Sequence, residues 1–233
     1  PDWIVDDPGA VVARGAGWPI PRPVPPERTL AVVLSSGSSG GRPRGVRLSR
    51  AAFVASARAS EANLGWRPGD RWLLGIPLSH VGGLSVLVRA LLARRPVVLE
   101  DDRPFDPERL VRSLEVGGAS IVSLVPAQLA RLVDRAPPPG LRAVLLGGAA
   151  APPAQLAEAA DRGWPVLTTY GLSEACSQVA TQRPGTTNRG ELGVGRPLPG
   201  VEVRIAAEEI QVRGPTLFDG YHPGGPSPFL EGG

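Results

Sequence analysis

The 233-residue sequence contains no lysine, no methionine and a single cysteine, Cys176. One cysteine cannot form an internal disulfide framework or a cysteine zinc cluster, so we expect Cys176 to pack as a small apolar side chain. No stretch has the pattern of a secretory signal, and no apolar run reaches the ~18 residues that a membrane span needs. We therefore expect a cytoplasmic protein that has no membrane partner.

Clustered charge is also missing from the sequence. All 25 basic residues are arginine, and they are scattered among 22 acidic residues, which gives a net charge of +3. A nucleic-acid surface usually gathers basic residues into a block with aromatic side chains between them, and neither pattern occurs. We expect no nucleic-acid partner. Because methionine is absent, we also expect the sequence to start inside a longer gene product.

Glycine and proline, by contrast, are abundant, with 30 and 27 residues. Apolar runs nevertheless persist, and 42% apolar against 20% charged residues is typical of a folded, loop-rich enzyme domain. We expect a proline-rich N-terminal arm at 1–29, an α/β core at 30–190 that binds a nucleotide and an acyl group, and a β-rich subdomain at 191–233.

The core alternates between expected strands and expected helices. We expect strands at 30–34, 71–77, 96–100, 120–124, 141–148 and 165–171. We expect a first helix after Ser49, with an apolar stripe at Phe53, Ala57 and Leu64, and further helices at 84–95, 106–118, 126–136 and 152–163. The run Leu30–Leu34 is suited to a strand buried on both faces, and Ser49 and Asp106 are suited to cap helices. Strict alternation predicts an α/β fold whose mostly parallel sheet is flanked by helices, and the final segment predicts an antiparallel hairpin or a small barrel-like subdomain.

The loop SSGSSGGRPRG (35–45), directly after the first expected strand, consists almost entirely of serine, glycine and arginine. Backbone N–H groups and hydroxyls in such a loop can surround an anion, usually phosphate, and Arg42 and Arg44 add positive charge. Two known phosphate loops do not fit. The nucleotide-kinase loop needs lysine and then Ser/Thr after its second glycine, and the dinucleotide pattern G-x-G-x-x-G is absent.

The same loop also contains G-x-S-x-G at 37–41, the nucleophile elbow of α/β-hydrolases, with Ser39 as the nucleophile. That elbow requires a helix directly behind the serine, which the glycines and Pro43 oppose. Asp219 and His222 follow in hydrolase order but lie only three residues apart. A hydrolase, and a flexible surface loop without function, stay open as alternatives.

Taken together, LSSGSSGGRPRGV resembles the signature loop of the adenylate-forming superfamily, which includes acyl- and aryl-CoA ligases, luciferases and peptide-synthetase adenylation domains. Arg44 stands where that signature has lysine. Further segments resemble motifs of the superfamily in the same order: IPLSHVGGL (76–84), LLGGAAAP (145–152), TYGLSEA (169–175), and the β-rich GVGRPLPGVEVRI and EIQVRGPTLFDGYH. The resemblance covers about residues 30–233 and implies the fold of the large N-terminal domain of these ligases.

The resemblance implies a site for ATP, magnesium and a carboxylic acid. The implied roles are ATP phosphate binding by Ser35, Ser36, Gly37, Ser38, Ser39, Gly40, Arg44 and Ser173; adenine binding by Gly148, Ala149, Ala150, Tyr170 and Gly171; acyl-substrate binding by His80, Gly82, Gly83, Ser177 and Gln178; magnesium binding by Glu174; and catalysis by Arg44, His80 and Glu174. Physical chemistry agrees, because Tyr170 offers a flat face for adenine and a carboxylate beside phosphate oxygens suits magnesium. Each of these residues also has a purely structural alternative. Tyr170 could be a core aromatic residue, Glu174 a solvated glutamate at a helix start, and His80 a histidine in a turn.

The implied reaction has two steps. A carboxylate attacks the α-phosphate of ATP and expels pyrophosphate, and the acyl-adenylate then passes its acyl group to coenzyme A while AMP leaves. The segment YGLSEACSQVATQ (170–182) resembles the o-succinylbenzoate–CoA ligases of menaquinone biosynthesis, which implies o-succinylbenzoate as the acid. Another aryl- or acyl-CoA ligase, and a non-catalytic nucleotide-binding module, stay open, as does a homodimer.

One departure from the superfamily bears on activity. Its members carry a small C-terminal cap domain with a catalytic lysine, whereas this sequence contains no lysine. We expect the cap domain, and most of the N-terminal portion that usually precedes the loop, to be absent from this chain. We therefore expect the chain to bind ATP or an acyl-adenylate but to turn over poorly by itself.

Overall fold

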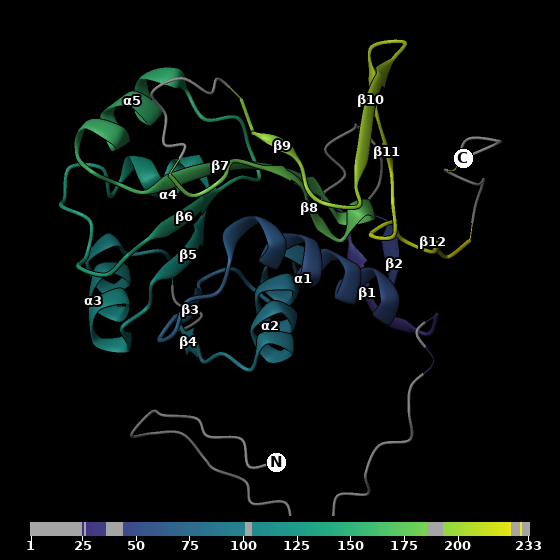
Figure 1. The fold of residues 1–233 in the computed structure, drawn as a ribbon, viewed down its shortest axis with the longest axis horizontal. Coiled ribbons are helices and arrows are strands. Elements are labelled where there is room, and N and C mark those ends of the chain that lie inside the picture. Colours follow the sequence, from purple (N-terminus) through teal and green to yellow (C-terminus); the bar gives the residue numbers. More distant parts are fainter. Residues whose placement is uncertain are drawn as a thin grey trace, which may run out of the picture.

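The computed structural model describes residues 25, 27–35, 44–100, 104–185, 193–224 and 229. Its largest feature is a seven-stranded sheet with the order β4-β3-β5-β6-β7-β8-β9 (Figure 1). These strands are β3 (Trp72–Leu74), β4 (Val97–Leu99), β5 (Ile121–Leu124), β6 (Ala143–Leu146), β7 (Val166–Leu172), β8 (Ser177–Thr181) and β9 (Arg196–Pro197). Strands β3 to β7 run parallel, and β8 and β9 extend the sheet antiparallel. The expected mostly parallel sheet is confirmed.

Helices cover both faces of the parallel strands (Figure 1). They are α1 (Arg50–Leu64), α2 (Val81–Ala93), α3 (Pro107–Gly117), α4 (Pro126–Ala130) and α5 (Pro153–Asp161). On one face α3, α4 and α5 pack against Leu73 and Val122, and on the other α1 and α2 pack against Trp72 and Ile121. Because consecutive strand residues point to opposite faces, both faces need apolar residues, as the sequence provides. None of the described helices has both the length and the apolar character needed to cross a bilayer.

The helix ends largely follow the expected capping residues. Ser49 caps α1 and Asp106 caps α3, each with its side chain accepting a backbone N–H, at 3.2 and 2.7 Å. Gly118 ends α3 with a φ of 58°, which is strained for other residues. Most helix boundaries lie within about two residues of the expected ones, but α2 begins at Val81 instead of 84 and α4 ends at Ala130 instead of 136.

A second sheet has three antiparallel strands in the order β1-β2-β12, namely β1 (Thr29–Leu34), β2 (Gly45–Ser49) and β12 (Gly220–His222). The expectation that Leu30–Leu34 is buried on both faces is wrong. This segment forms an edge strand, in which Leu30, Val32 and Leu34 are 53, 52 and 67% exposed while Val33 is 3% exposed. A short apolar run does not by itself distinguish a central parallel strand from an edge strand that is covered on one face only.

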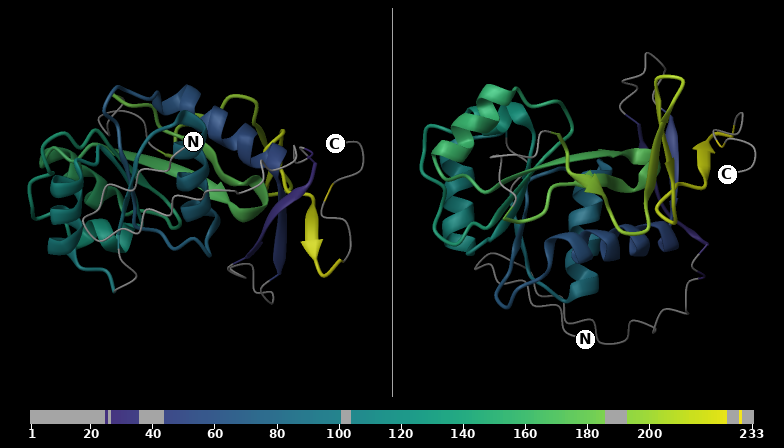
Figure 2. Two further views of the ribbon diagram at one scale, coloured as in Figure 1. Left: turned by 90° about the horizontal axis from the view of Figure 1, so that it is seen from below. Right: turned by 45° about the horizontal axis from the view of Figure 1, so that its top comes forward.

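The chain reverses directly after the last parallel strand. A single 3-10 turn, η1 (Ser173–Ala175), leads from β7 into β8, a strand that the sequence patterns do not predict. The expected C-terminal hairpin is confirmed as β10 (Glu202–Ala206) and β11 (Glu209–Arg213). Figures 1 and 2 show this hairpin extending away from the helices.

A buried ion pair ties together the amino ends of three parallel strands. Asp70, just before β3, accepts hydrogen bonds from Arg142 Nη2 at 2.6 Å and Nε at 2.9 Å. Ser120, just before β5, donates to the same carboxylate at 2.6 Å. Asp70 is 3% exposed, so the pair is held away from water with its hydrogen bonds made.

Candidate active site

A cleft of about 1870 Å³ opens at the carboxyl ends of the parallel strands. One side is formed by the residues that follow β3, β5 and β6, by the end of β7 and by the start of α2. The other side is formed by the facing ends of β1 and β2, by β12 and by the hairpin β10–β11. Open α/β sheets usually bind ligands at this edge, so the cleft is the candidate site.

The cleft brings together most of the site residues expected from the sequence. Those that line it are Ser35, Arg44, His80, Gly82, Gly148, Tyr170, Gly171, Ser173, Glu174, Ser177 and Gln178. The five loop positions Ser36, Gly37, Ser38, Ser39 and Gly40 lie outside the described residues. Residues far apart in the sequence therefore share one cavity, as a two-substrate site requires.

Three expected site residues do not line the cleft. Gly83 is buried in the first turn of α2, where a Cβ would lie 2.5 Å from the carbonyl oxygens of Ile76 and Pro77. This glycine lets the helix pack against the preceding turn, and no cleft contact supports a role in substrate binding. Ala149 and Ala150 are exposed, and they too lie outside the cleft lining.

The two ends of the serine–glycine loop are held by a hairpin. The Ser35 N–H donates to the Arg44 carbonyl at 2.9 Å, and the Arg44 N–H donates to Ser35 Oγ at 3.1 Å. The strand β2 follows directly, where the nucleophile elbow of a hydrolase would need a helix. This geometry opposes the hydrolase alternative for Ser39, a residue that itself lies outside the described part of the chain.

Tyr221, which the sequence patterns do not single out, contacts two expected site residues. Its hydroxyl donates to Glu174 Oε1 at 3.0 Å, and the guanidinium of Arg44 lies 3.8 Å from its ring centroid. Burial, together with the Glu174 carboxylate, raises the pKa of Tyr221 above its usual value of 10, so the hydroxyl stays a donor at neutral pH. The pairing of β12 with β2 brings Tyr221 beside Arg44, and the hydrogen bond from the Phe218 N–H to the Glu174 carbonyl brings it beside Glu174. Both contacts join segments far apart in the sequence, which explains why no local pattern identifies Tyr221.

Glu174 is the carboxylate that suits a magnesium ion. Among the described residues, no three histidine, cysteine, aspartate or glutamate side chains gather into a metal-binding group. Magnesium usually binds through one or two carboxylates together with water and substrate phosphates, so one carboxylate is sufficient when the ion arrives with a nucleotide. Glu202 and Glu209 also line the cleft, on the hairpin β10–β11. The residues present therefore fit magnesium.

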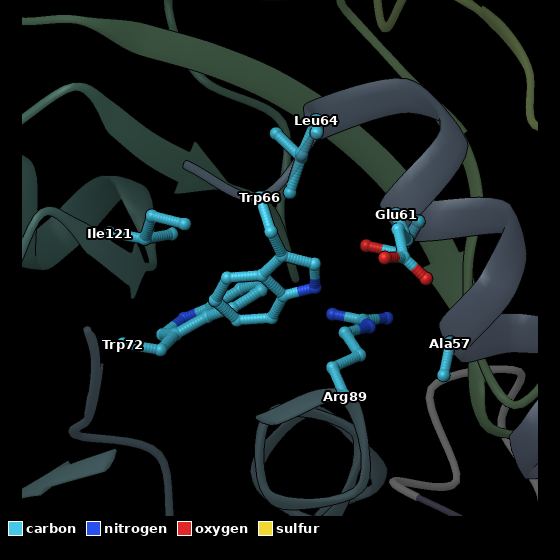
Figure 3. A pocket seen from close by; sticks show the side chains of 9 residues that line it. Ala57, Glu61, Leu64, Trp66, Trp72, Arg89 and Ile121 are labelled. Carbon is cyan, nitrogen blue, oxygen red and sulfur yellow. The ribbon is translucent and has the colours of Figure 1, made fainter. Parts of the chain in front are cut away.

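Arg89 is a cleft residue that sequence reasoning missed. It is 4% exposed, and its Nε and Nη2 have no hydrogen-bond partner among the described residues. It also borders a small cavity of about 10 Å³, which Glu61 and Trp66 line as well (Figure 3). Burial lowers the pKa of Arg89 to about 10, so the side chain remains a cation at neutral pH. The sequence feature that could have identified Arg89 is its position as one arginine inside the apolar helical run LSVLVRALLA.

Gln178 and Gly171 shape the wall between β7 and β8. Gln178 is 4% exposed, and its Nε2 donates to Thr181 Oγ1 at 2.8 Å, while its buried Oε1 has no partner in the described part of the chain. A Cβ on Gly171 would collide with the carbonyl oxygen of Ser177, so only glycine lets the strands approach this closely. The cleft surface at Gly171 therefore consists of peptide backbone.

Cys176 follows the turn η1 and is fully buried. Burial raises the pKa of its thiol to about 12, and the Ser56 hydroxyl donates to its carbonyl oxygen at 2.8 Å. A thiol with this pKa is a poor nucleophile at neutral pH. The expectation that Cys176 packs as a small apolar side chain is confirmed.

Comparisons with known proteins agree with this geometry. The family described as AMP-binding enzyme matches residues 5–222. The 2-succinylbenzoate–CoA ligases of Bacillus pumilus and Bacillus licheniformis are 35% and 37% identical over 206 and 204 residues, which is 83% and 82% of this chain but 42% of each relative. Solved structures of o-succinylbenzoate coenzyme A synthetase from Bacillus subtilis, with ATP and magnesium or with the acyl-adenylate OSB-AMP, give TM-scores of 0.78 and 0.79 at 32% identity, covering 84% of this chain and 43% of theirs. The chain spans less than half the length of these relatives.

Proposed function

The chain belongs to the AMP-binding enzymes, and from this premise we propose that it binds the nucleotide and the acid of an AMP-forming acid–CoA ligase. The observation that carries the proposal is the single cleft that Arg44, Tyr170 and Glu174 line together with His80 and Gln178. Two substrates that react with each other must lie in one cavity in a fixed orientation, and this orientation accounts for much of the rate enhancement of such reactions.

On the nucleotide side of the cleft, the proposal assigns phosphate binding to Ser35, Arg44 and Ser173 and adenine binding to Tyr170. The arginine fork suits phosphate oxygens because it donates parallel hydrogen bonds and carries a permanent charge. Glu174 would hold magnesium, which supplies positive charge to the phosphates when it is bound. The contribution of the chain itself is then to orient the α-phosphate toward the acid and to neutralise charge there.

On the acid side, we propose o-succinylbenzoate as the substrate. A dicarboxylate keeps one free carboxylate after the other has been activated, and a buried carboxylate needs a partner. Two nitrogens of Arg89, in the cleft wall, have no hydrogen-bond partner among the described residues, although the guanidinium lies over the Trp72 ring. They support such a substrate, because a monocarboxylate would leave them without an anionic partner. His80, at the start of α2, and Ser177 line the same cavity and are assigned to the acid.

The proposed reaction begins when a carboxylate oxygen of the acid forms a bond to the α-phosphorus of ATP and the bond to pyrophosphate breaks. In the second step the sulfur of coenzyme A forms a bond to the acyl carbon and AMP leaves. ATP, the acid and coenzyme A are thus the proposed partners. In this scheme the residues of the cleft act by binding and orientation, and the chain has no lysine that could serve as the catalytic lysine implied by the resemblance.

Isothermal titration calorimetry on the 233-residue chain tests the proposal through binding, which does not depend on turnover. The ligands are ATP with magnesium, o-succinylbenzoate, and 3-benzoylpropionate, which differs from o-succinylbenzoate only in lacking the ring carboxylate. We expect ATP with magnesium to bind, and o-succinylbenzoate to bind at least ~10-fold more tightly than 3-benzoylpropionate, the factor that one charge-assisted hydrogen bond provides. Absence of ATP binding would contradict the proposed ligase function. Equal affinity for the two acids would contradict o-succinylbenzoate as the substrate.

A further inference from the structure

Arg44 and Glu174 carry opposite charges and line the same part of the cleft, yet no ion pair joins these two described residues. The side chain of Tyr221 contacts both of them at once. The Arg44 guanidinium lies 3.8 Å from the centroid of its ring, and Glu174 Oε1 accepts a hydrogen bond from its hydroxyl at 3.0 Å. One aromatic side chain therefore separates a cation from a carboxylate.

The backbone fixes the position of Tyr221. Tyr221 pairs with Val46 of β2 in antiparallel register, and Arg44 lies just before that strand. The ring of Phe218 packs edge-on against Tyr221 at a centroid distance of 4.9 Å, and the Phe218 N–H donates to the Glu174 carbonyl at 2.9 Å. Strand pairing thus places Tyr221 beside Arg44, while the contact of Phe218 with the turn η1 places it beside Glu174.

The separation has a consequence for ligand binding. A guanidinium and a carboxylate in direct contact form strong paired hydrogen bonds, and a ligand would have to break them before it could use either group. The face of an aromatic ring attracts a cation without neutralising it. A hydroxyl that donates to one carboxylate oxygen likewise leaves the negative charge in place. Tyr221 therefore contacts both groups without an ion pair forming between them, and both line the cleft.

We propose that Tyr221 is a positioning residue that keeps Arg44 and Glu174 apart in the free protein, so that the cation is available to phosphate oxygens and the carboxylate to magnesium. The inference rests on the proposed function and adds to it a residue outside the motifs that suggested that function. Tyr221 acts through Arg44 and Glu174, and no contact with substrate is assigned to it.

Two variants of the 233-residue chain separate the two contacts. Tyr221→Phe keeps the ring beneath Arg44 and removes only the hydroxyl, whereas Tyr221→Leu removes both. Calorimetry with ATP plus magnesium, with ATP plus EDTA, and with AMP provides the readout. For Tyr221→Phe we expect about 5-fold weaker binding of ATP with magnesium, the effect of one hydrogen bond, and unchanged binding of ATP in EDTA. For Tyr221→Leu we expect roughly 10-fold or greater weakening with magnesium and a loss in EDTA as well.

Controls exclude a general effect on the fold. The affinity for AMP, which lacks the β- and γ-phosphates, should be unchanged in both variants. His222→Asn, at the exposed position next to Tyr221 on β12, should leave all three affinities unchanged. If Tyr221→Phe and Tyr221→Leu both bind ATP with magnesium as the wild type does, the inference is wrong. If the wild type itself does not bind ATP, the proposed function fails instead.

A crystal structure of ligand-free Tyr221→Leu tests the inference without any nucleotide. We expect the guanidinium of Arg44 and the carboxylate of Glu174 to form a direct ion pair in this variant. Continued separation of the two groups would overturn the inference, whatever the binding data show.

Discussion

A charged group buried at the amino ends of the parallel strands has its hydrogen-bond partners, whereas a charged group buried beside the cleft lacks some of them. At the amino ends, Asp70 is hydrogen-bonded to Arg142 and Ser120, and each of these residues lies within two positions of the start of a strand. Arg89, on α2, is equally buried and lines both the cleft and the small cavity at Trp72. Its guanidinium lies 5.5 Å from the centroid of the Trp72 ring, but two of its nitrogens have no hydrogen-bond partner in the described part of the chain. Burial of an unpaired charge opposes folding, so the comparison favours a structural role for Asp70 and agrees with the ligand-binding role proposed above for Arg89.

Asp70→Asn tests the paired charged group and should have the largest effect. The substitution leaves Arg142 buried without a counter-charge, so we expect the free energy of unfolding to fall by about 3–5 kcal/mol. Chemical denaturation with urea measures this change, and Asp161→Asn, at an exposed position on α5, is the control with an unchanged midpoint. A loss below about 1 kcal/mol would mean that Asp70 does not hold the strands together.

Arg89→Leu tests the incompletely paired charged group and should act on binding but not on folding. We expect o-succinylbenzoate to bind roughly 100-fold more weakly, because its free carboxylate would be buried without a partner, and ATP affinity to stay unchanged. The melting temperature should stay the same or rise, since the variant removes a buried unpaired charge. Calorimetry and thermal unfolding measure the two effects, with exposed Arg58→Leu as the control. If Arg89→Leu greatly lowered the melting temperature, Arg89 would stabilise the fold as Asp70 does, and the proposed difference between the two residues would be wrong.

Acid should weaken the ion pair between Asp70 and Arg142. Burial alone would raise the pKa of Asp70, but hydrogen bonds from Arg142, Ser120 and the Arg67 N–H, and the charge of Arg142, outweigh it and hold the pKa below 3.8. A group with a lowered pKa stabilises the fold above the pKa of the unfolded chain and loses that contribution as the pH falls through the folded value. We therefore expect the difference in stability between wild type and Asp70→Asn to be constant above about pH 5 and to shrink below pH 4. A difference that does not vary with pH would contradict the ion pair.

Glu202→Gln should have the smallest effect and shows that pairing matters only where charge is buried. Glu202 accepts a hydrogen bond from Arg213 on the hairpin β10–β11, where both side chains are about two-thirds exposed. Exposed pairs contribute less than about 1 kcal/mol, so the urea midpoint should hardly move. A loss comparable to that of Asp70→Asn would show that burial does not explain the contrast.

The parallel core could be predicted from the sequence because its signals are local. Alternating apolar runs, with Ser49 and Asp106 as helix caps, identify most elements from short windows. The edge strand at Leu30–Leu34 and the reversal into β8 could not be predicted, because both depend on which surface another segment covers. The division into 1–29, 30–190 and 191–233 stays a prediction.

The candidate site divides in the same way. Arg44, Tyr170 and Glu174 lie in motifs that the sequence shows directly, and they line one cleft. Tyr221 and Arg89 were missed, because the first depends on strand pairing and the second on the depth at which a helix is buried. The roles of these residues toward substrates stay predictions until binding is measured.

The backbone surface at Gly171 limits how the specificity of this protein can evolve. A peptide group offers the same hydrogen-bonding atoms whatever the gene encodes, and any side chain at position 171 would push β7 and β8 apart. Substitution at position 171 therefore cannot adapt this part of the cleft wall to a new substrate. Changes in preference must come from side chains that line the same cleft, such as Ser177 and His80.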